Sequence, residues 1–301
     1  MSTNLRRIQK IKGGSYIVSL PSDWVRDNGL DVTREVEVFE SSGIIKIRPK
    51  KDFNSERVIE YTDEETAEYL ISVYYMQGMT KISLQSKDVI SRDVKDRIKM
   101  LQLELPGLNL KEETFNSLIF EVDEEILKVQ DSFFDFSNKA LSILKDVTKV
   151  IETPREDMKQ DLTSRCLALN SDYYKLIRSI ALTVQRDDKY KLDVPIKDII
   201  LYAVASRDLG RFITHTRLLI GNIKQEDMKL RDEILLLINT MENIINMFKT
   251  EDINMAPRIR RNAHEILENI KSSSESNKEL ERMTGYALAL MDDAVHKAVH
   301  I

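Results

Sequence analysis

The start of the chain decides the fold of its first domain, and it reads RRIQKIKGGSYIVSLPSDWVRDNGL from Arg6 to Leu30. The Gly13-Gly14 pair predicts a strained turn, because glycine adopts left-handed backbone conformations without a steric penalty. After it, the apolar run 16–20 predicts a short strand that Pro21 ends, since proline has no N–H to donate to a ladder. We therefore expect a basic strand, a turn and a second, apolar strand.

A short helix over residues 23–28 is expected next, with Ser22 as its N-cap and Gly29 as the residue that ends it. Trp24 is expected to anchor this helix in a core rather than to stack on a nucleic-acid base.

Residues 35–39 and 44–48 alternate polar and apolar side chains around a Ser-Ser-Gly turn at 41–43, which predicts a β-hairpin. Residues 1–52 are too few to bury a good core alone, because domains below about 40–60 residues are marginal without disulfides or metal. The single cysteine, Cys166, excludes an internal disulfide and a Cys-rich zinc site. We therefore expect two copies of the chain to interleave these strands as a homodimer.

Positive charge gathers in the first 51 residues, although the whole chain carries a net charge of −5. No acidic residue precedes Asp23, and the second basic cluster contains none. Lys and Arg side chains grouped in this way are typical of contacts with DNA phosphates. The candidate DNA-binding residues are Arg6, Arg7, Lys10, Lys12, Arg26, Lys46 and Arg48, and Lys50 and Lys51 complete the second cluster.

Each group of cations has a structural alternative. The first four also fit a solvated charged tail. Arg26 stands between Asp23 and Asp27, whose carboxylates compete for its guanidinium group. Lys46 and Arg48 also fit the task of solubilising an edge strand.

Composition bounds the class of protein. With 42% hydrophobic and 32% charged residues, the 301-residue chain has globular rather than disordered composition, and its length suits two or three domains. Charges interrupt every apolar run before the about 20 residues that a membrane helix needs. We expect a cytoplasmic protein without membrane insertion, cofactor or metal.

Residues 53–125 alternate strand and helix patterns in the order β-α-β-α-β-β, which predicts a small α/β unit that acts as a spacer or a second dimer contact.

From 126 to 301 the apolar residues keep a helical period. Ser276 and Glu279 are the expected capping box of the last helix. Six helices are expected, at 126–152, 155–188, 195–221, 226–250, 253–271 and 276–299. Their short links favour antiparallel packing as two three-helix bundles in tandem, so the chain is expected to be mainly α.

The first block resembles the SpoVT/AbrB family of swapped-hairpin DNA-binding domains. The resemblance rests on residues 14–21, Trp24, Gly29-Leu30 and the hairpin with Gly43. It implies a dimer whose basic strand and loop surface lies against double-stranded DNA.

The helical block resembles PhoU, the family of phosphate-uptake regulators, whose fold is a tandem of three-helix bundles. Two segments, Leu209–Thr216 and Leu280–Ala287, match the family's repeated Leu-Glu-Arg-x-x-Asp-His-Ala motif, and their spacing suits a duplicated unit. An AbrB-like domain joined to a PhoU-like region resembles archaeal phosphate regulators. A phosphate-transport or signalling protein is then an expected partner.

The PhoU resemblance also implies a metal cluster held by carboxylates spaced four residues apart on one helix face. The corresponding pairs here are Asn170 and Tyr174, Gly210 and Thr214, and Glu281 and Gly285. Only one of the six is a carboxylate, so no metal site is expected.

Two functions of different classes remain open. The first is a transcription regulator whose N-terminal domain binds DNA while the helices sense or dock a partner. The second is an adaptor that touches no DNA and docks a transporter or kinase of phosphate uptake, which the overall acidity and the acids Asp23, Asp27 and Asp31 favour. The chain is not expected to be an enzyme, because no nucleotide loop, metal constellation or nucleophile with a nearby base is recognisable.

Overall fold

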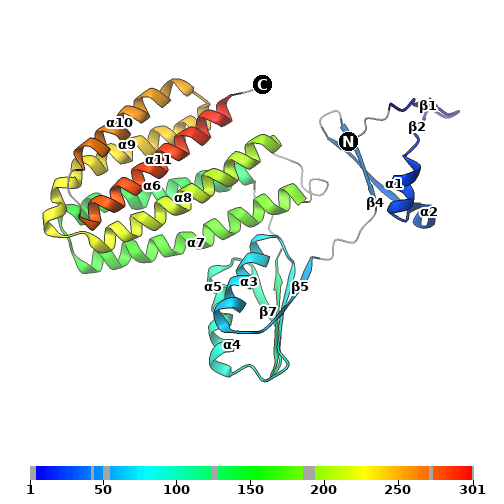
Figure 1. The fold of residues 1–301 in the computed structure, drawn as a ribbon, viewed down its shortest axis with the longest axis horizontal. Helices are drawn as coiled ribbons and strands as arrows, with labels where there is room; N and C mark the ends of the chain where they lie inside the picture. The colour runs from blue at the N-terminus through cyan, green and yellow to red at the C-terminus, as the bar shows by residue number, and fades with distance from the viewer. Residues whose placement is uncertain are drawn as a thin grey trace. The chain divides into compact units, whose positions relative to one another are not determined.

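The computed structural model describes residues 5–41, 44–49, 55–123, 128–185, 194–270 and 274–299. The chain divides into two compact units, Met1–Asn54 and Ser55–Ile301 (Figure 1). The expected hairpin turn at Ser42 and Gly43 and the cations Lys50 and Lys51 lie outside the described residues.

The first unit contains two antiparallel hairpins with two short helices between them. In chain order its elements are β1 (Gln9–Lys10), β2 (Tyr16–Ile17), α1 (Ser22–Asp27), α2 (Leu30–Thr33), β3 (Val36–Ser41) and β4 (Ile44–Pro49). β1 pairs with β2, and β3 pairs with β4 with Ser41 opposite Ile44. The second hairpin confirms the expectation from the alternating pattern, whereas β2 is much shorter than the expected strand over 16–20.

The α1 helix ends as expected but begins differently. Gly29 has φ +65° and donates its N–H to Arg26 O, which closes the helix in the left-handed conformation that glycine favours. The expectation for Ser22 was wrong, because Ser22 is already in the helix and Pro21 takes the N-cap position without a side-chain cap. Trp24 is only half-buried within this chain, so it does not fill a core of its own unit.

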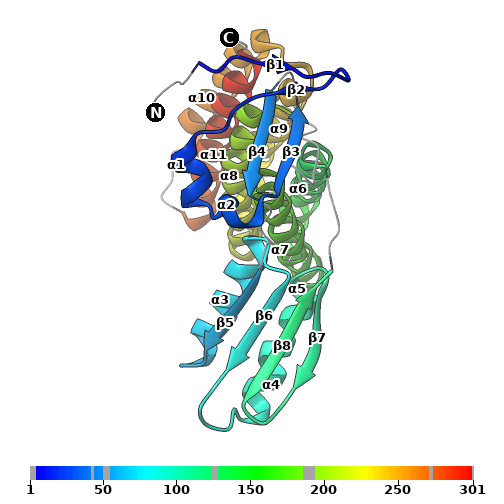
Figure 2. The same cartoon turned by 90° about the vertical axis from the view of Figure 1, so that its right-hand side faces the viewer.

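The second unit begins with a four-stranded sheet covered on one face by helices (Figure 2). The strand order is β5-β6-β8-β7, with β5 parallel to β6 and the other pairs antiparallel. The elements are β5 (Glu56–Glu60), α3 (Glu64–Met76), β6 (Lys81–Gln85), α4 (Arg92–Lys99), α5 (Leu101–Glu104), β7 (Leu108–Glu113) and β8 (Ser117–Val122). This is the expected order of strands and helices, with the last expected helix divided into α4 and α5.

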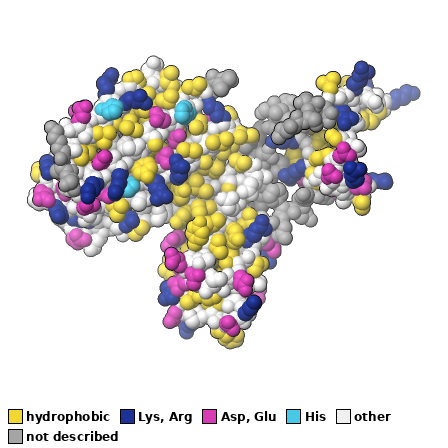
Figure 3. All heavy atoms as spheres, viewed as in Figure 1, with side chains coloured by type: hydrophobic (Ala, Val, Ile, Leu, Met, Phe, Trp, Pro, Cys, Tyr) yellow, Lys and Arg dark blue, Asp and Glu magenta, His cyan; other side chains and the backbone are white. Residues whose placement is uncertain are grey.

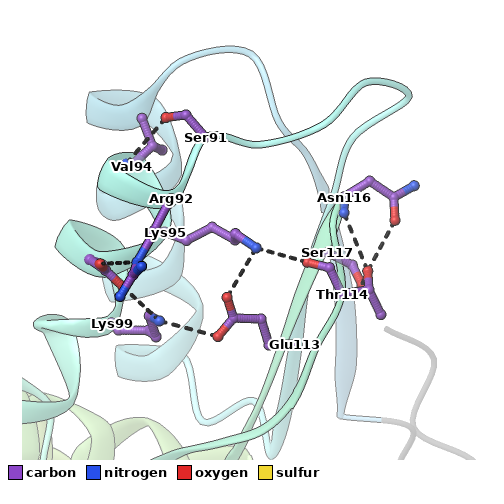
Figure 4. Close-up of polar contacts among 10 residues, drawn as sticks. Ser91, Arg92, Val94, Lys95, Lys99, Glu113, Thr114, Asn116 and Ser117 are labelled. Carbon is purple, nitrogen blue, oxygen red and sulfur yellow. Dashed lines mark hydrogen bonds and ion pairs between the residues drawn. The ribbon is translucent and has the colours of Figure 1, made fainter.

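Ionic contacts fasten the β7–β8 hairpin to α4 (Figure 4). Lys95 is buried and donates to Thr114 O at 3.0 Å, and its Nζ lies 3.0 Å from Glu113 Oε1. Lys99 reaches the other carboxylate oxygen of Glu113 at 3.1 Å. These hydrogen bonds lower the pKa of Glu113, so the carboxylate stays charged between two lysines.

The remaining helices form a bundle around one continuous core. They are α6 (Val129–Glu152), α7 (Glu156–Gln185), α8 (Ile196–Asn222), α9 (Arg231–Thr250), α10 (Ala256–Asn269) and α11 (Glu275–Ala298), with 3-10 turns at Gln225–Leu230 and Ile253–Met255. Helices α6, α7 and α8 contact one another, as do α9, α10 and α11, and α8–α11 and α6–α9 contacts join the two groups. Aromatic side chains, among them Phe133, Tyr202 and Phe248, meet in the shared core.

The expected capping box of α11 was wrong. Ser274 caps the helix by accepting from Asn277 N, whereas Ser276 is buried and donates to Asp227 Oδ2 at 2.8 Å. Glu279 is buried as well and pairs with His215 Nδ1 on α8 at 2.6 Å. Both residues therefore join α11 to distant parts of the chain instead of capping its first turn.

The α/β part and the bundle share an interface within the second unit. Arg178 on α7 is buried, donates to Tyr75 O at 2.7 Å and Met79 O at 3.0 Å, and lies over the Tyr75 ring. Gly78 lies against Leu182, where an added Cβ would come within 2.8 Å of the leucine side chain. The C-terminal end of α3 is thus fixed on α7.

No helix in the described parts of the chain combines the length and the apolar character needed to cross a lipid bilayer.

Candidate nucleic-acid interface

The β1–β2 hairpin positions the first basic cluster. Gln9 pairs with Ile17 and Lys10 with Tyr16, and the turn closes through Ile11 N to Ser15 O at 3.0 Å. Gly13 and Gly14 have φ values of +116° and +95°, which confirms the strained turn expected at this pair. A side chain at either position would force the turn to change.

The four cations on and before this hairpin are all exposed, and none of them forms an ion pair with a described residue. They are Arg6, Arg7, Lys10 and Lys12. Figure 3 shows Lys and Arg side chains gathered at the β1–β2 end of the first unit. Their charge is therefore available for an external anion, because no carboxylate among the described residues neutralises it.

The other candidates come from different elements and are already engaged within the chain. Arg26 lies on α1 with its Nη2 at 2.9 Å from Asp23 Oδ1. Arg48 lies on β4 with its Nε at 2.7 Å from Glu37 Oε2 and its guanidinium group over the Phe39 ring. Lys46, exposed on the same strand, stands opposite Phe39 in the register. Within one chain, the first four cations therefore lie on or just before the β1–β2 hairpin, whereas Arg26, Lys46 and Arg48 lie on other elements.

Sequence reasoning missed Arg34. This exposed residue ends α2 with φ +53°, an uncommon backbone conformation for a residue other than glycine. Its side chain forms no ion pair with a described residue, so it is a further cation of the first unit. The sequence feature that could have identified Arg34 is its position in the short link 34–35, between a segment with a helical pattern and a segment with a strand pattern.

The first unit leaves most of its apolar side chains uncovered. Of its described residues, Leu30 alone is buried. On the β3–β4 hairpin, Val36, Val38, Ile45 and Ile47 lie on one face, since Val38 pairs with Ile47 and Val36 with Pro49. Val38 is 60% exposed and Ile45 is 66% exposed. Covering a side chain of this size contributes about 1.5–3 kcal/mol, so this face favours association.

The positions that the PhoU resemblance assigns to metal ligands do not fit a metal. Asn170, Tyr174, Gly210 and Thr214 line one cavity together with two arginines, and none of the four offers a carboxylate. Among the described residues, no three His, Cys, Asp or Glu side chains come together as metal ligands. Cationic surroundings would oppose a bound metal ion.

The remaining candidate residues of the bundle have structural roles. Cys166 is buried in the core, and burial raises its pKa to about 11, so the thiol is not activated. His215 is hydrogen-bonded to Glu279, and its ring stacks on Tyr286.

Comparison with known families gives a match in the first unit. Residues 9–55 match the family described as antidote-toxin recognition MazE, bacterial antitoxin. This match supports an N-terminal DNA-binding domain of the swapped-hairpin type, and domains of this type dimerise and bind DNA. No curated protein and no solved structure matches the chain.

Proposed function

We propose that the protein is a homodimeric, DNA-binding transcription regulator of phosphate uptake that acts in the cytoplasm and has no enzymatic activity. The observation that carries the DNA-binding part is the set of four exposed cations around the Gly13-Gly14 turn, with no ion pair to a described residue. They lie in the segment that matches a family of the swapped-hairpin type, apart from Arg6 and Arg7 just before it.

Two copies of the first unit double this set of charges. Contacts between Lys or Arg side chains and phosphates give affinity that does not depend on base sequence and falls steeply with salt. The uncovered apolar face of the β3–β4 hairpin supplies the surface on which the two copies interleave. In the dimer, the basic turns of both chains would contact one duplex.

The regulatory part of the proposal assigns the helical region to a PhoU-like sensor. Its support is the place of the two motif segments, 209–216 and 280–287, on α8 and α11, two helices that contact each other. His215 in the first segment pairs with Glu279, directly before the second. A phosphate-transport or signalling protein that binds one arrangement of these helices more tightly than the other would change the affinity for DNA. The size of that change is set by the difference between the partner's affinities for the two arrangements.

The second candidate is a phosphate-signalling adaptor that docks a transporter or kinase without binding DNA. The ion pairs of Arg26 with Asp23 and of Arg48 with Glu37 favour it, because they engage two of the expected DNA-binding side chains within the chain. Co-purification of a transporter subunit with the protein, and no binding to duplex DNA at low salt, would select this candidate.

Fluorescence anisotropy with a labelled duplex at rising salt tests the proposal. We expect the double variant Arg6→Ala/Arg7→Ala to reduce the slope of log affinity against log salt by about 3–4, because a dimer loses four cations. The matched control, Arg258→Ala/Arg261→Ala, removes two exposed arginines from α10 and should keep the wild-type slope. No binding at low salt, or an unchanged slope in the first variant, would overturn the proposal.

A further inference from the structure

The cavity that contains four of the positions assigned to metal ligands by the PhoU resemblance lies between α7 and α8 and has a volume of about 220 Å³. Tyr173 and Tyr174 line it from α7, and Arg207 and Arg211 line it from α8. This volume is below the about 300–1,000 Å³ that is typical of ligand pockets, so a nucleotide-sized molecule would lie partly inside the cavity and partly at its opening.

The two arginines give the cavity its charge. They are four residues apart on α8 and so share one face of the helix. Arg207 Nη2 and Nε lie 2.9 and 3.0 Å from Asp208 Oδ1. Arg211 is exposed and forms no ion pair with a described residue, which leaves net positive charge at the cavity. Guanidinium groups hold phosphate through paired N–H donors.

Aromatic rings form the opposite wall. The Tyr173 ring lies 5.9 Å from Tyr174 and 6.3 Å from Phe136, centroid to centroid. Burial raises the pKa of the Tyr173 hydroxyl, and the nearby charges of Arg211 and Arg207 oppose that rise. The hydroxyl is therefore a proton donor at neutral pH, close to both guanidinium groups.

Gly210 keeps the space between these walls open. It lies within α8, where glycine is unfavourable compared with alanine. A Cβ at this position would meet the Tyr173 ring at 3.6 Å, an ordinary contact, so a larger side chain would extend along the wall of the cavity without breaking the helix. Replacing Gly210 by a residue with a larger side chain should therefore fill the cavity.

We propose that this cavity binds a small phosphate ester with a planar ring, of which a nucleoside monophosphate is the simplest example. Arg207 and Arg211 hold the phosphate, the two tyrosine rings contact the planar ring, and the Asn170 side-chain amide at the cavity wall hydrogen-bonds its polar edge. The proposal that this ligand acts as an effector, by changing the affinity for DNA, rests on the proposed DNA-binding function. The proposal that the ligand binds in the cavity does not.

Isothermal titration calorimetry of the full chain without DNA tests the site, with AMP, adenosine and inorganic phosphate as probes. AMP is expected to bind more tightly than either of the other two. Arg211→Ala, which removes an exposed side chain, and Gly210→Leu, which fills the cavity, are each expected to weaken AMP binding at least about tenfold. Arg261→Ala, an exposed arginine on α10, is the control and should bind AMP like the wild type.

Undetectable AMP binding, or equal binding by the wild type and by both cavity variants, would overturn the site. Inorganic phosphate binding as tightly as AMP would overturn the role of the rings, and adenosine binding as tightly would overturn the role of the arginines. The anisotropy titration repeated with AMP separates the two proposals: unchanged DNA affinity with AMP bound refutes the effector role alone. Failure of the wild type to bind DNA refutes the proposed function and leaves the calorimetric result standing.

Discussion

The two units of this chain differ in how they cover their apolar side chains. The second unit buries large residues such as Tyr75 and Phe120 in one core and Phe133 and Phe248 in another. The first unit buries only Leu30 among its described residues. A core of that size does not balance the conformational entropy that folding costs. The second unit can therefore be stable within one chain, whereas the first requires an additional surface.

The largest expected effect is dissociation of the dimer. Val38→Asp places a carboxylate on the apolar face of the β3–β4 hairpin, where the account puts the contact between two chains. An unpaired charge in such a contact costs several kcal/mol, so the dimer should dissociate at concentrations where the wild type is fully associated. Light scattering coupled to gel filtration measures the change in mass.

Val58→Asp is the matched control for this variant. Val58 is 61% exposed on β5 in the second unit, which has its own core, so the same substitution there should leave the mass unchanged. A Val38→Asp protein with the wild-type mass and wild-type DNA affinity would contradict the role of the hairpin face.

The next effect concerns the core of the second unit. Phe133 is 2% exposed and its ring lies 5.0 Å from those of both Tyr202 and Phe248. Phe133→Ala should lower the free energy of unfolding of the bundle by about 3–5 kcal/mol, through lost burial and the cavity left behind. Urea unfolding followed by circular dichroism measures this loss. A loss under about 1 kcal/mol would show that the bundle does not depend on this aromatic cluster.

Local patterns in the sequence predicted the elements better than the contacts between them. The hairpin strands β3 and β4 lie within two residues of the expected 35–39 and 44–48, and α9 ends at Thr250 as expected, because apolar periodicity reports directly on each element. Ser276 and Glu279 were misread as a capping box, since their partners Asp227 and His215 are distant in sequence. Local spacing carries no information about such partners.

The candidate site was predictable in part for the same reason. The strained turn at Gly13-Gly14 follows from the conformational freedom of glycine. The engagement of Arg48 by Glu37 depends on the register of the β3–β4 hairpin, which places the two residues opposite each other. The expectation that Trp24 fills a core could not be met within one chain, because the first unit has almost no core of its own.

A smaller effect concerns the interface inside the second unit. Arg178→Met keeps much of the side-chain volume but removes the donors to Tyr75 O and Met79 O. We expect a loss of about 2–4 kcal/mol in the free energy of unfolding, because hydrogen bonds from a charged group are lost in a buried place. Arg261→Ala, exposed on α10, should stay within about 0.5 kcal/mol of the wild type. Equal urea midpoints for the two variants would refute this role of Arg178.

The last expected effect is a pH dependence from Asp293 on α11. Burial, and then repulsion from Asp208, raise the pKa of Asp293 from 3.8 to about 6. The folded state therefore resists ionisation of this group, and its stability should fall as the pH rises from about 4 to above 6. Asp293→Asn should be more stable than the wild type at pH 7.5 and equal to it near pH 4.

Urea midpoints at both pH values measure this difference. Asp292→Asn is the control, since Asp292 is exposed with its Oδ1 at 3.7 Å from Arg260. A wild-type protein that gains stability relative to Asp293→Asn as the pH rises would contradict the assigned direction.

Hydrogen exchange measured on the full chain at decreasing concentration shows whether the first unit depends on a second chain, since it follows both units in one sample. Amides of residues 9–41 and 44–49 are expected to lose protection on dilution, as the dimer dissociates, while those of β6 and α9 keep theirs. Protection of residues 9–41 and 44–49 that does not change with dilution, in a sample whose mass equals one chain of 34.9 kDa, would contradict dimerisation through the first unit.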